Sequence, residues 1–237
     1  MKRILITTLA ALLPFCTVSA EDASVHIAIT PEVHKGTEAR HTQFNEISKK
    51  GEAQLVFLGD SITQGWEGQG GIWKAAWEKY KPANFGIGGD RTEHVLWRLD
   101  NGNFDGLKPK LVVLMIGTNN TGHRGGKETP EQTAAGVKAI LERLAKKCPD
   151  TKVLLLGIFP RGATAEDNLR VHNAAINEHL AHLADGKKVY YQDIGKAFLQ
   201  PDGTLTKEIM PDLLHLSPKG YQIWADSIKD KVAELMK

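Results

Sequence analysis

The chain has 237 residues, of which 41% are hydrophobic and 24% are charged. This length and composition predict one globular domain with a full core, and no repeat or low-complexity tract indicates a fibrous or disordered chain. With 30 basic and 28 acidic side chains the formal net charge is +2, which gives no reason to expect nucleic acid or an anionic membrane as a partner.

The first twenty residues have the pattern of a secretory signal peptide. Lys2 and Arg3 form a basic start, residues 4–13 are almost entirely apolar, and small residues lead up to Ala20. The pattern predicts cleavage after Ala20, a secreted or periplasmic protein, and no membrane anchor, because the apolar stretch is too short to span a bilayer. After cleavage 28 basic and 28 acidic residues remain, and Cys148 is the single cysteine, which excludes an internal disulfide.

The mature chain is expected to divide near residue 50. Residues 21–50 are predicted to form an N-terminal arm followed by a surface helix from Thr37 to Lys50, which ends at Gly51. Residues 51–237 are predicted to form the main domain.

Five apolar stretches alternate with helical patterns along this domain. They predict strands at Gln54–Leu58, Ala83–Ile87, Leu111–Ile116, Lys152–Ile158 and Lys188–Gln192. Good start signals for helices lie at Thr129-Pro130 and Ser217-Pro218. Strands that alternate with helices predict an α/β fold, with a five-stranded parallel sheet covered by helices on both sides in three α/β/α layers.

Two segments near the predicted strand ends are expected to be loops. Gln64–Gly71 is rich in glycine around Trp66, and Thr121–Glu128 carries His123 and Arg124. Since loops at strand ends often carry binding residues, Trp66, His123 and Arg124 are candidate substrate contacts.

A possible nucleophile follows the first predicted strand directly. Ser61 comes after an apolar run and Gly59-Asp60, at the edge of the sheet where open α/β folds bind ligands. A serine hydroxyl needs a base within hydrogen-bonding reach and a third group that orients the base. Asp212 and His215, three residues apart, can supply both, so Ser61, His215 and Asp212 are the predicted catalytic triad. The alternative is that Ser61 merely caps the next helix.

Acyl transfer also needs donors that stabilise the developing oxyanion. The backbone N–H groups of Ser61 and Gly88 and the side-chain amide of Asn119 all follow predicted strands, so we expect them to form the oxyanion hole. Asp60 is expected to hold its turn, and Asp90 and Arg91 to pair beside Gly88.

The motifs together resemble those of the SGNH, or GDSL, hydrolases. The matching blocks are Gly59-Asp60-Ser61, the turn at Gly88, Gly117-Thr118-Asn119, and Asp212-x-x-His215. Further stretches are similar to the catalytic subunits of intracellular platelet-activating-factor acetylhydrolase: Asn84–Asp90, His94–Leu99 and Leu156–Gly162.

The resemblance implies a flavodoxin-like fold, the triad and oxyanion hole named above, and hydrolysis of short acyl esters, acetyl above all, without a metal or cofactor. It also implies a monomer or homodimer. The related subunits work in the cytosol, whereas this chain has a predicted signal peptide, and exported relatives deacetylate carbohydrates. O-acetyl groups on carbohydrates are therefore the expected substrate, with a lipid acylhydrolase, lysophospholipase or thioesterase as the alternative. The non-enzymatic alternative is a carbohydrate-binding module on the same fold.

Overall fold

The computed structural model describes residues 27–124 and 127–237. The expected signal peptide, residues 1–20, lies outside this part of the chain. Five strands form one sheet in which every pair is parallel, in the order β2-β1-β3-β4-β5. Their bounds are β1 Leu55–Gly59, β2 Pro82–Gly86, β3 Leu111–Met115, β4 Lys152–Leu156 and β5 Val189–Gln192. The predicted flavodoxin-like α/β fold is thus confirmed, with each strand end within two residues of its expected place.

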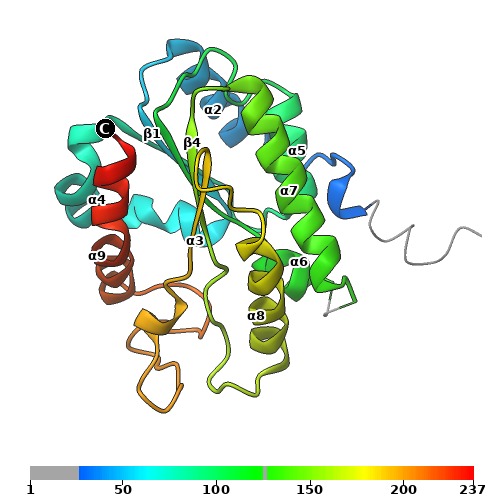
Figure 1. Cartoon of the computed structure of the whole chain (residues 1–237), viewed down its shortest axis with the longest axis vertical. Coiled ribbons are helices and arrows are strands. Elements are labelled where there is room, and N and C mark those ends of the chain that lie inside the picture. The colour runs from blue at the N-terminus through cyan, green and yellow to red at the C-terminus, as the bar shows by residue number, and fades with distance from the viewer. Residues whose placement is uncertain (1–26, 125–126) are drawn as a thin grey trace, which may run out of the picture.

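Helices cover both faces of the sheet (Figure 1). One layer holds α2 (Glu38–Lys50), α5 (Thr92–Asp100), α7 (Pro130–Lys147) and α8 (Asn168–Ala181), and the other holds α4 (Gly70–Trp77) and α9 (Pro218–Leu235). Short helical segments complete the chain: α3 (Ser61–Gln64), α6 (Thr118–His123), η1 (Gly65–Gly68), η2 (Glu78–Tyr80) and η3 (Gly195–Phe198). None of the helices in the described ranges is both long and apolar enough to cross a membrane.

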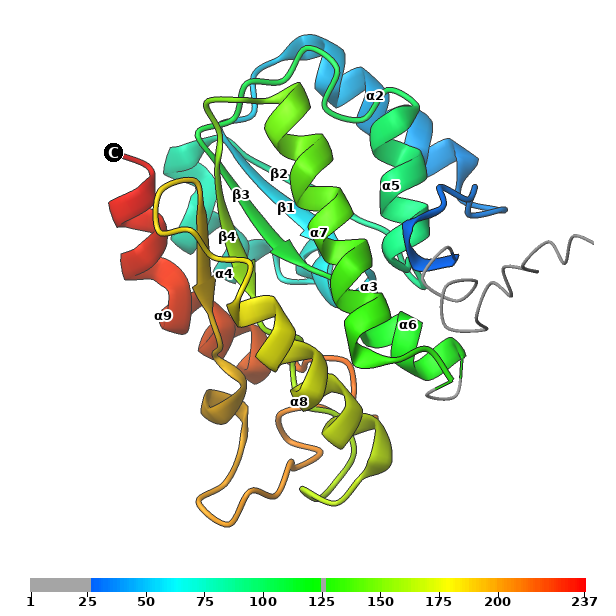
Figure 2. The same ribbon diagram turned by 45° about the vertical axis from the view of Figure 1, so that its right-hand side comes forward.

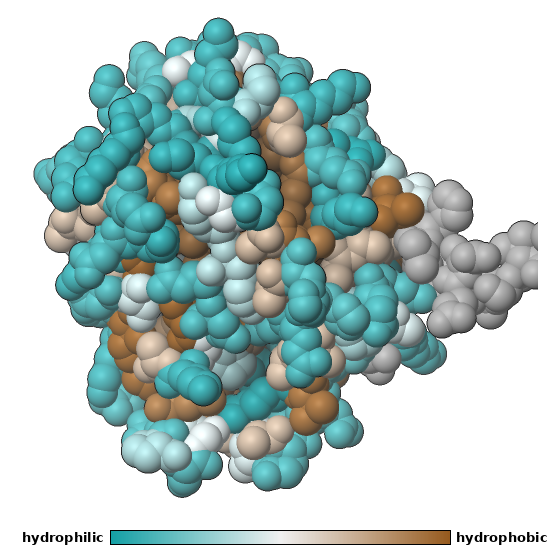
Figure 3. All heavy atoms as spheres, viewed as in Figure 1, coloured by the Kyte–Doolittle hydropathy of each residue, from teal (hydrophilic) through white to brown (hydrophobic). Residues whose placement is uncertain are grey.

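The central strands are buried on both faces, because successive side chains point into different cores. In β1, Val56 and Leu58 pack with α5 and α7, whereas Leu55 and Phe57 pack with α4 and α9. This explains why the strand sequences are unbroken apolar runs rather than alternating ones. Polar residues cover most of the molecular face in Figure 3, and apolar side chains show through the gaps between them.

Local signals place the helix starts well. Thr129 caps α7 in a reciprocal capping box with Gln132, and the Ser217 hydroxyl accepts the Gly220 N–H at the start of α9. Gly51, with φ +68°, ends α2 as predicted.

The first of the two expected loops is mostly helical, which corrects that expectation, whereas in Thr121–Glu128 only the residues up to His123 are helical and the other described residues are not. Gln64–Gly71 forms the end of α3, η1 and the start of α4, and the segment after Asn119 forms α6 as far as His123. Glycine-rich composition suggested loops, but packing against neighbouring helices and the sheet edge outweighs the weak helix propensity of these residues.

The N-terminal arm lies across the start of α5. The Thr92 hydroxyl donates to the Ala28 carbonyl over 2.9 Å, and the Glu32 N–H donates to the Glu93 carbonyl over 3.1 Å. The arm therefore packs directly on the domain, and a division of the chain at residue 50 stays a prediction.

The order of the strands in the sheet determines where the candidate site lies. Strand β1 lies between β2 and β3, so the connection from β1 to β2 runs to one side of β1 and the connection from β2 to β3 returns to the other side. At such a reversal of strand order a crevice forms, here at the carboxyl ends of β1 and β3. Figure 2 shows these strands ending on the side where α3 and α6 lie. The segments that carry Ser61 and Asn119 begin at this point.

Candidate active site

Ser61 is presented by a tight turn between β1 and α3. The Asp60 carboxylate caps α3 by accepting the Ile62 N–H over 3.0 Å. Gly59 is required because a Cβ atom there would lie only 2.3 Å from the Met115 carbonyl oxygen and the Thr63 hydroxyl. The turn therefore packs closely against β3 and leaves Ser61 half-buried at the crevice.

The predicted triad residues are within hydrogen-bonding distance. Ser61 Oγ lies 2.9 Å from His215 Nε2, and His215 Nδ1 lies 2.6 Å from Asp212 Oδ2. Leu213 takes a left-handed conformation, with φ +61°, and this lets the Asp212 carboxylate fold back onto the His215 ring. The triad is open to solvent, since the side chains of Asp212 and His215 are 56% and 46% exposed.

Hydrogen bonds keep Asp212 ionised. Partial burial acts to raise the pKa of its carboxyl, but donors from the His215 ring and from the Leu214 and His215 N–H groups outweigh burial and lower it. A carboxylate in this position fixes the Nδ1–H tautomer of His215 and stabilises the imidazolium that forms when Nε2 takes a proton. The arrangement is therefore suited to removing the proton from Ser61.

Gly88 lies beside Ser61, but a side chain occupies its N–H group. A Cβ at Gly88 would lie 3.8 Å from the Ser61 Cβ, and the Gly88 N–H donates to Gln64 Oε1 over 2.7 Å. Gln64, at the end of α3, was not foreseen from the sequence. An oxyanion can use the Gly88 donor only after displacing this carboxamide.

Asn119 is anchored to the same turn. Its Nδ2 donates to the Asp90 carbonyl over 3.0 Å, and the second N–H of the amide remains for another acceptor. The side chain is buried, so a hydrogen bond to a developing anion there is worth more than one in water.

The Gly88 turn rests on a buried ion pair. Asp90 is fully buried, and its Oδ2 accepts from Arg98 over 2.8–2.9 Å while its Oδ1 contacts His34 Nδ1 over 2.7 Å. The expected Asp90–Arg91 pair is therefore wrong, because Arg91 pairs with Glu93 instead. Neither Arg98 nor His34 was predicted here, since the sequence carries no local signal for partners 8 and 56 positions away.

The three candidate substrate contacts have different outcomes. Trp66 is 1% exposed and packs among Phe57, Tyr221 and Trp224, so the structure places it in the core rather than on a loop at the triad. Arg124 is held by ion pairs to Glu93 and Glu128.

His123 is the candidate that lies near the oxyanion turn. Its Cε1 and that of His34 lie 3.7 Å and 3.3 Å from where a Cβ at Gly89 would be. Burial and the charges of Arg91, His34 and Arg161 lower the pKa of His123, which favours its neutral form.

Asp60 carries an unusual carboxyl group directly behind the nucleophile. Its side chain is fully buried, and Oδ2 has no hydrogen-bond partner among the described residues. Burial raises the pKa of Asp60 to about 7, an effect that the Ile62 N–H opposes and the Asp90 carboxylate reinforces.

One cluster has the composition of a metal site. The potential ligand atoms of His34, Asp90 and His94 all lie within 4.8 Å of one another. However, His94 Nδ1 accepts the Arg91 N–H over 3.1 Å, and Arg98 binds the Asp90 carboxylate. These partners already use the ligand atoms, so the cluster is better suited to holding the turn than to binding a cation.

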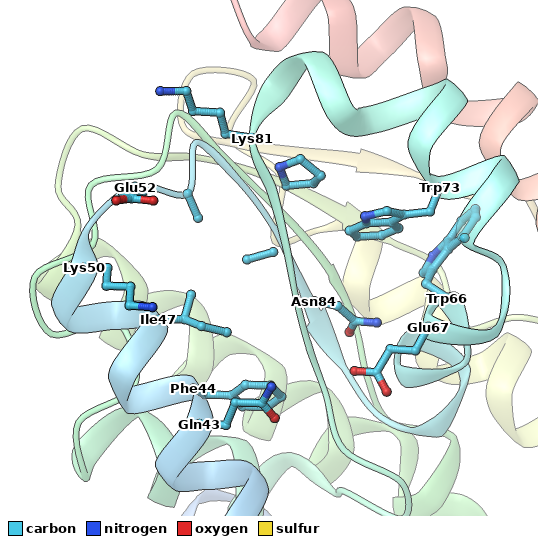
Figure 4. A pocket seen from close by; sticks show the side chains of 14 residues that line it. Gln43, Phe44, Ile47, Lys50, Glu52, Trp66, Glu67, Trp73, Lys81 and Asn84 are labelled. Carbon is cyan, nitrogen blue, oxygen red and sulfur yellow. The ribbon is translucent and has the colours of Figure 1, made fainter.

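A separate cavity of about 650 Å³ lies between α2, the amino-terminal half of β2, and α4 (Figure 4). The side chains of Phe44, Ile47 and Trp73 face it, with Glu67 and Asn84 at one end. None of the triad residues lines this cavity.

Comparisons with known proteins show the family of this chain. The model of the GDSL-like lipase/acylhydrolase family matches residues 57–223. The chain belongs to this family. Among the curated relatives, the human platelet-activating factor acetylhydrolase IB subunit alpha1 is 41% identical over 182 residues, covering 76% of each chain. The rat subunit alpha2 of the same enzyme is 35% identical over 199 residues, covering 84% of each chain.

Solved structures confirm the fold. A GDSL-like lipase from Bacteroides thetaiotaomicron superposes with a TM-score of 0.69 at 19% identity, over 84% of this chain and 98% of that one. An acetylxylan esterase from Geobacillus stearothermophilus gives a TM-score of 0.62 at 18% identity, over 78% and 96%. Family, relatives and site geometry together identify the chain as an acylhydrolase of the GDSL type, a serine ester hydrolase.

These relatives contradict the expected secretion. They are subunits of the intracellular platelet-activating-factor acetylhydrolase that the sequence motifs resemble. The prediction of a secreted or periplasmic protein depended on residues 1–20, which lie outside the described chain. The apolar residues 4–13 match the composition of a signal peptide, but composition alone does not establish export.

Proposed function

We propose that the chain hydrolyses short acyl esters, acetyl esters above all, with Ser61 as nucleophile, His215 as general base and acid, and Asp212 as the group that orients His215. The observation that carries the proposal is the continuous chain of contacts from Ser61 Oγ through His215 to Asp212, 2.9 Å and 2.6 Å long. Ser61, Gly88 and Asn119 are the proposed oxyanion donors.

The reaction has two halves. Ser61 Oγ attacks the ester carbonyl while His215 Nε2 takes its proton, and His215 then returns the proton to the departing alcohol. Water, activated by the same nitrogen, next attacks the acyl-enzyme and releases the acid. In each half the oxyanion replaces Gln64 Oε1 as the acceptor for the Gly88 N–H, an exchange that favours the charged acceptor because charge-assisted hydrogen bonds are stronger.

The carrier of the acetyl group is proposed to be a carbohydrate. The triad side chains are about half exposed, so a bulky carrier can reach them. The side chains around the Gly88 turn are polar ones, including Gln64, His34 and His123, and these suit a hydroxylated carrier rather than a long acyl chain.

The test is hydrolysis of p-nitrophenyl esters from acetate to octanoate. We expect the rate to fall with acyl length and Ser61→Ala to lower kcat by at least roughly 10⁴-fold. Ser227→Ala, which removes a hydroxyl bound to the Ile223 carbonyl on α9, is the matched control. A fluorophosphonate should label the wild type and not Ser61→Ala. Equal rates in both proteins would mean that the fold is present without the chemistry.

A second candidate is a lipid acetylhydrolase. Relatives that are 35–41% identical to this chain are subunits of an acetylhydrolase of platelet-activating factor. Comparing kcat/KM on an acetylated xylo-oligosaccharide with that on platelet-activating factor decides between the two carriers. A rate that peaks at octanoate would instead indicate an acylhydrolase for longer chains or a thioesterase.

A further inference from the structure

Arg161 differs from the other arginines in the described chain. Five of the others form ion pairs with carboxylates: Arg40, Arg91, Arg98, Arg124 and Arg143. Arg170 donates to three backbone carbonyls. Within residues 27–124 and 127–237, Arg161 forms no ion pair, and its hydrogen bonds come from one terminal nitrogen, to the Thr118 carbonyl and hydroxyl, both at 3.2 Å.

The contacts of Arg161 place it between two parts of the active site. Thr118, which it holds, directly precedes Asn119. On its other side, the Gly162 N–H donates to the Leu213 carbonyl over 3.0 Å, which ties the segment to the turn between Asp212 and His215. Arg161 therefore lies at the crevice that holds the triad.

Three carboxylates lie near Arg161, but within the described residues none of them forms an ion pair with it. Asp212 accepts from His215 and two backbone N–H groups. Asp167 caps α8 by accepting the N–H groups of Leu169 and Arg170. Asp60 accepts the Ile62 N–H and is fully buried. These carboxyl groups act on Arg161 only from a distance, so its guanidinium is not neutralised by direct contact.

The free part of the guanidinium has the geometry of an anion receptor. With one terminal nitrogen on Thr118, the Nε–H and the second terminal nitrogen form the edge that binds a carboxylate or phosphate through two parallel hydrogen bonds. Gly122 makes room for the group, since a Cβ there would lie 2.8 Å from the nitrogen that holds Thr118. Arg161 is half-buried, which strengthens its attraction for an anion relative to a fully hydrated arginine.

We propose that Arg161 binds an anionic group, a carboxylate or a phosphate, on the alcohol portion of the ester substrate. This rests on the proposed esterase function and narrows its substrate to acidic esters. An acetylated carbohydrate would then carry an acid group, and an acetylated lipid would present its phosphate.

The experiment compares three acetyl esters that differ in charge: phenyl acetate, 4-acetoxybenzoate and 4-acetoxyphenyl phosphate. For Arg161→Gln, we expect kcat/KM on the preferred anionic ester, relative to phenyl acetate, to fall roughly 10- to 100-fold. Arg161→Lys should lose less, since it keeps the charge without the planar fork. The anionic ester with the larger fall identifies carboxylate or phosphate as the ligand.

Arg143→Gln is the matched control, because Arg143 pairs with Asp100 on the surface and its loss should leave the ratio unchanged. An equal fall on all three esters in Arg161→Gln would mean that Arg161 acts only through Thr118 and would overturn the proposal, as would no fall at all.

Binding separates this proposal from the esterase function. Calorimetry with Ser61→Ala should detect benzoate or phenyl phosphate, and Ser61→Ala with Arg161→Gln should bind the same anion at least roughly tenfold more weakly. If the wild type cleaves none of the esters but this difference is found, the anion site stands and the esterase function fails. Active enzyme with no difference in binding leaves the esterase function intact and overturns the anion site.

Discussion

Asp212 and Asp90, two of the aspartates that have basic partners, have surroundings that differ in almost every respect. Asp212 contacts His215 where both side chains are about half exposed, whereas Asp90 contacts Arg98 with 0% and 2% of the side chains exposed. The first pair lies within one short turn. The second pair joins the Gly88 turn to α5, and the Arg98 side chain on that helix also donates to the Gly59 and Phe85 carbonyls.

The difference shows how burial decides the role of an ion pair. At Asp212, water is near and the partner is histidine, so a proton can move between Ser61, His215 and solvent. At Asp90, the partner is an arginine that keeps its charge, and separating the two would leave an unpaired charge in the core. The exposed pair of Asp212 and His215 is therefore suited to proton transfer. The buried pair of Asp90 and Arg98 is suited to holding the backbone that carries the proposed oxyanion donors.

The largest effect should come from the exposed pair. Asp212→Asn keeps the size of the side chain but no longer fixes the tautomer of His215, so kcat on p-nitrophenyl acetate should fall roughly 10⁴-fold with little change in the free energy of unfolding. Asp202→Asn is the control, because Asp202 also accepts a backbone N–H two residues on in an exposed turn. A fall of less than tenfold would show that His215 does not depend on Asp212.

The buried pair should respond in the opposite way. Arg98→Met leaves Asp90 without its main partner, and the free energy of unfolding in urea should fall by about 3–5 kcal/mol. Adding Asp90→Asn to this variant should restore part of the loss, because the unpaired charge is then removed. Arg143→Met breaks a surface pair and should cost less than about 1 kcal/mol. Similar losses in the two single variants would refute the distinction between them.

Asn119 connects the two regions, since its amide is held by the Asp90 carbonyl and is also a proposed oxyanion donor. Asn119→Ala should lower kcat roughly 10²- to 10³-fold, with a much smaller change in KM, because the amide acts mainly on the transition state. Asn101→Ala, which removes an exposed amide bound to the Trp97 carbonyl, is the control. A rise in KM at constant kcat would instead assign Asn119 to substrate binding.

The smallest effects concern the pH dependence of stability, where two buried groups act in opposite directions. Burial and the charge of Arg91 lower the pKa of His94 to about 4, so between pH 4 and 6.5 the unfolded chain binds a proton that the native protein does not, and acid destabilises the fold. Asp60, with its pKa raised to about 7, holds a proton in the native protein over the same range, and acid therefore stabilises it.

Variants separate the two contributions. Between pH 7 and pH 4, His94→Gln should lose less stability than the wild type and Asp60→Asn should lose more, each by about 3 kcal/mol. Urea denaturation across this range measures both differences. If both variants shift the profile in the same direction, one of the two pKa directions is wrong.

Local signals in the sequence were sufficient to predict the fold and to single out the candidate triad. Unbroken apolar runs such as Leu111–Met115 identify buried strands, the pair Thr129-Pro130 marks a helix start, and regular alternation of the elements requires parallel crossovers. The spacing of Asp212 and His215 is also local, because a turn of three residues determines whether they can touch. The comparisons confirm the family, while the catalytic roles of Ser61, His215 and Asp212 stay predictions.

Predictions from amino-acid composition were least reliable for segments whose conformation is decided by packing against neighbouring helices and strands. Glycines around Trp66 suggested a loop at the site, but the ring packs into an aromatic core and the segment is helical. Likewise, an apolar stretch near the amino terminus suggested export, which the relatives contradict.

The sequence by itself determined the features that depend on neighbours along the chain. These are the order of strands and helices, the helix caps, and the placement of Ser61, Asn119 and His215 after strands or turns. Only the tertiary structure decided which distant groups meet. Arg98 and His34 converge on Asp90, and Gln64 accepts the Gly88 N–H. Arg161 reaches Thr118 and pairs with no carboxylate of the part of the chain that the structure describes. The physical reason is that burial and charge pairing depend on long-range packing, and local propensity contains no information about them.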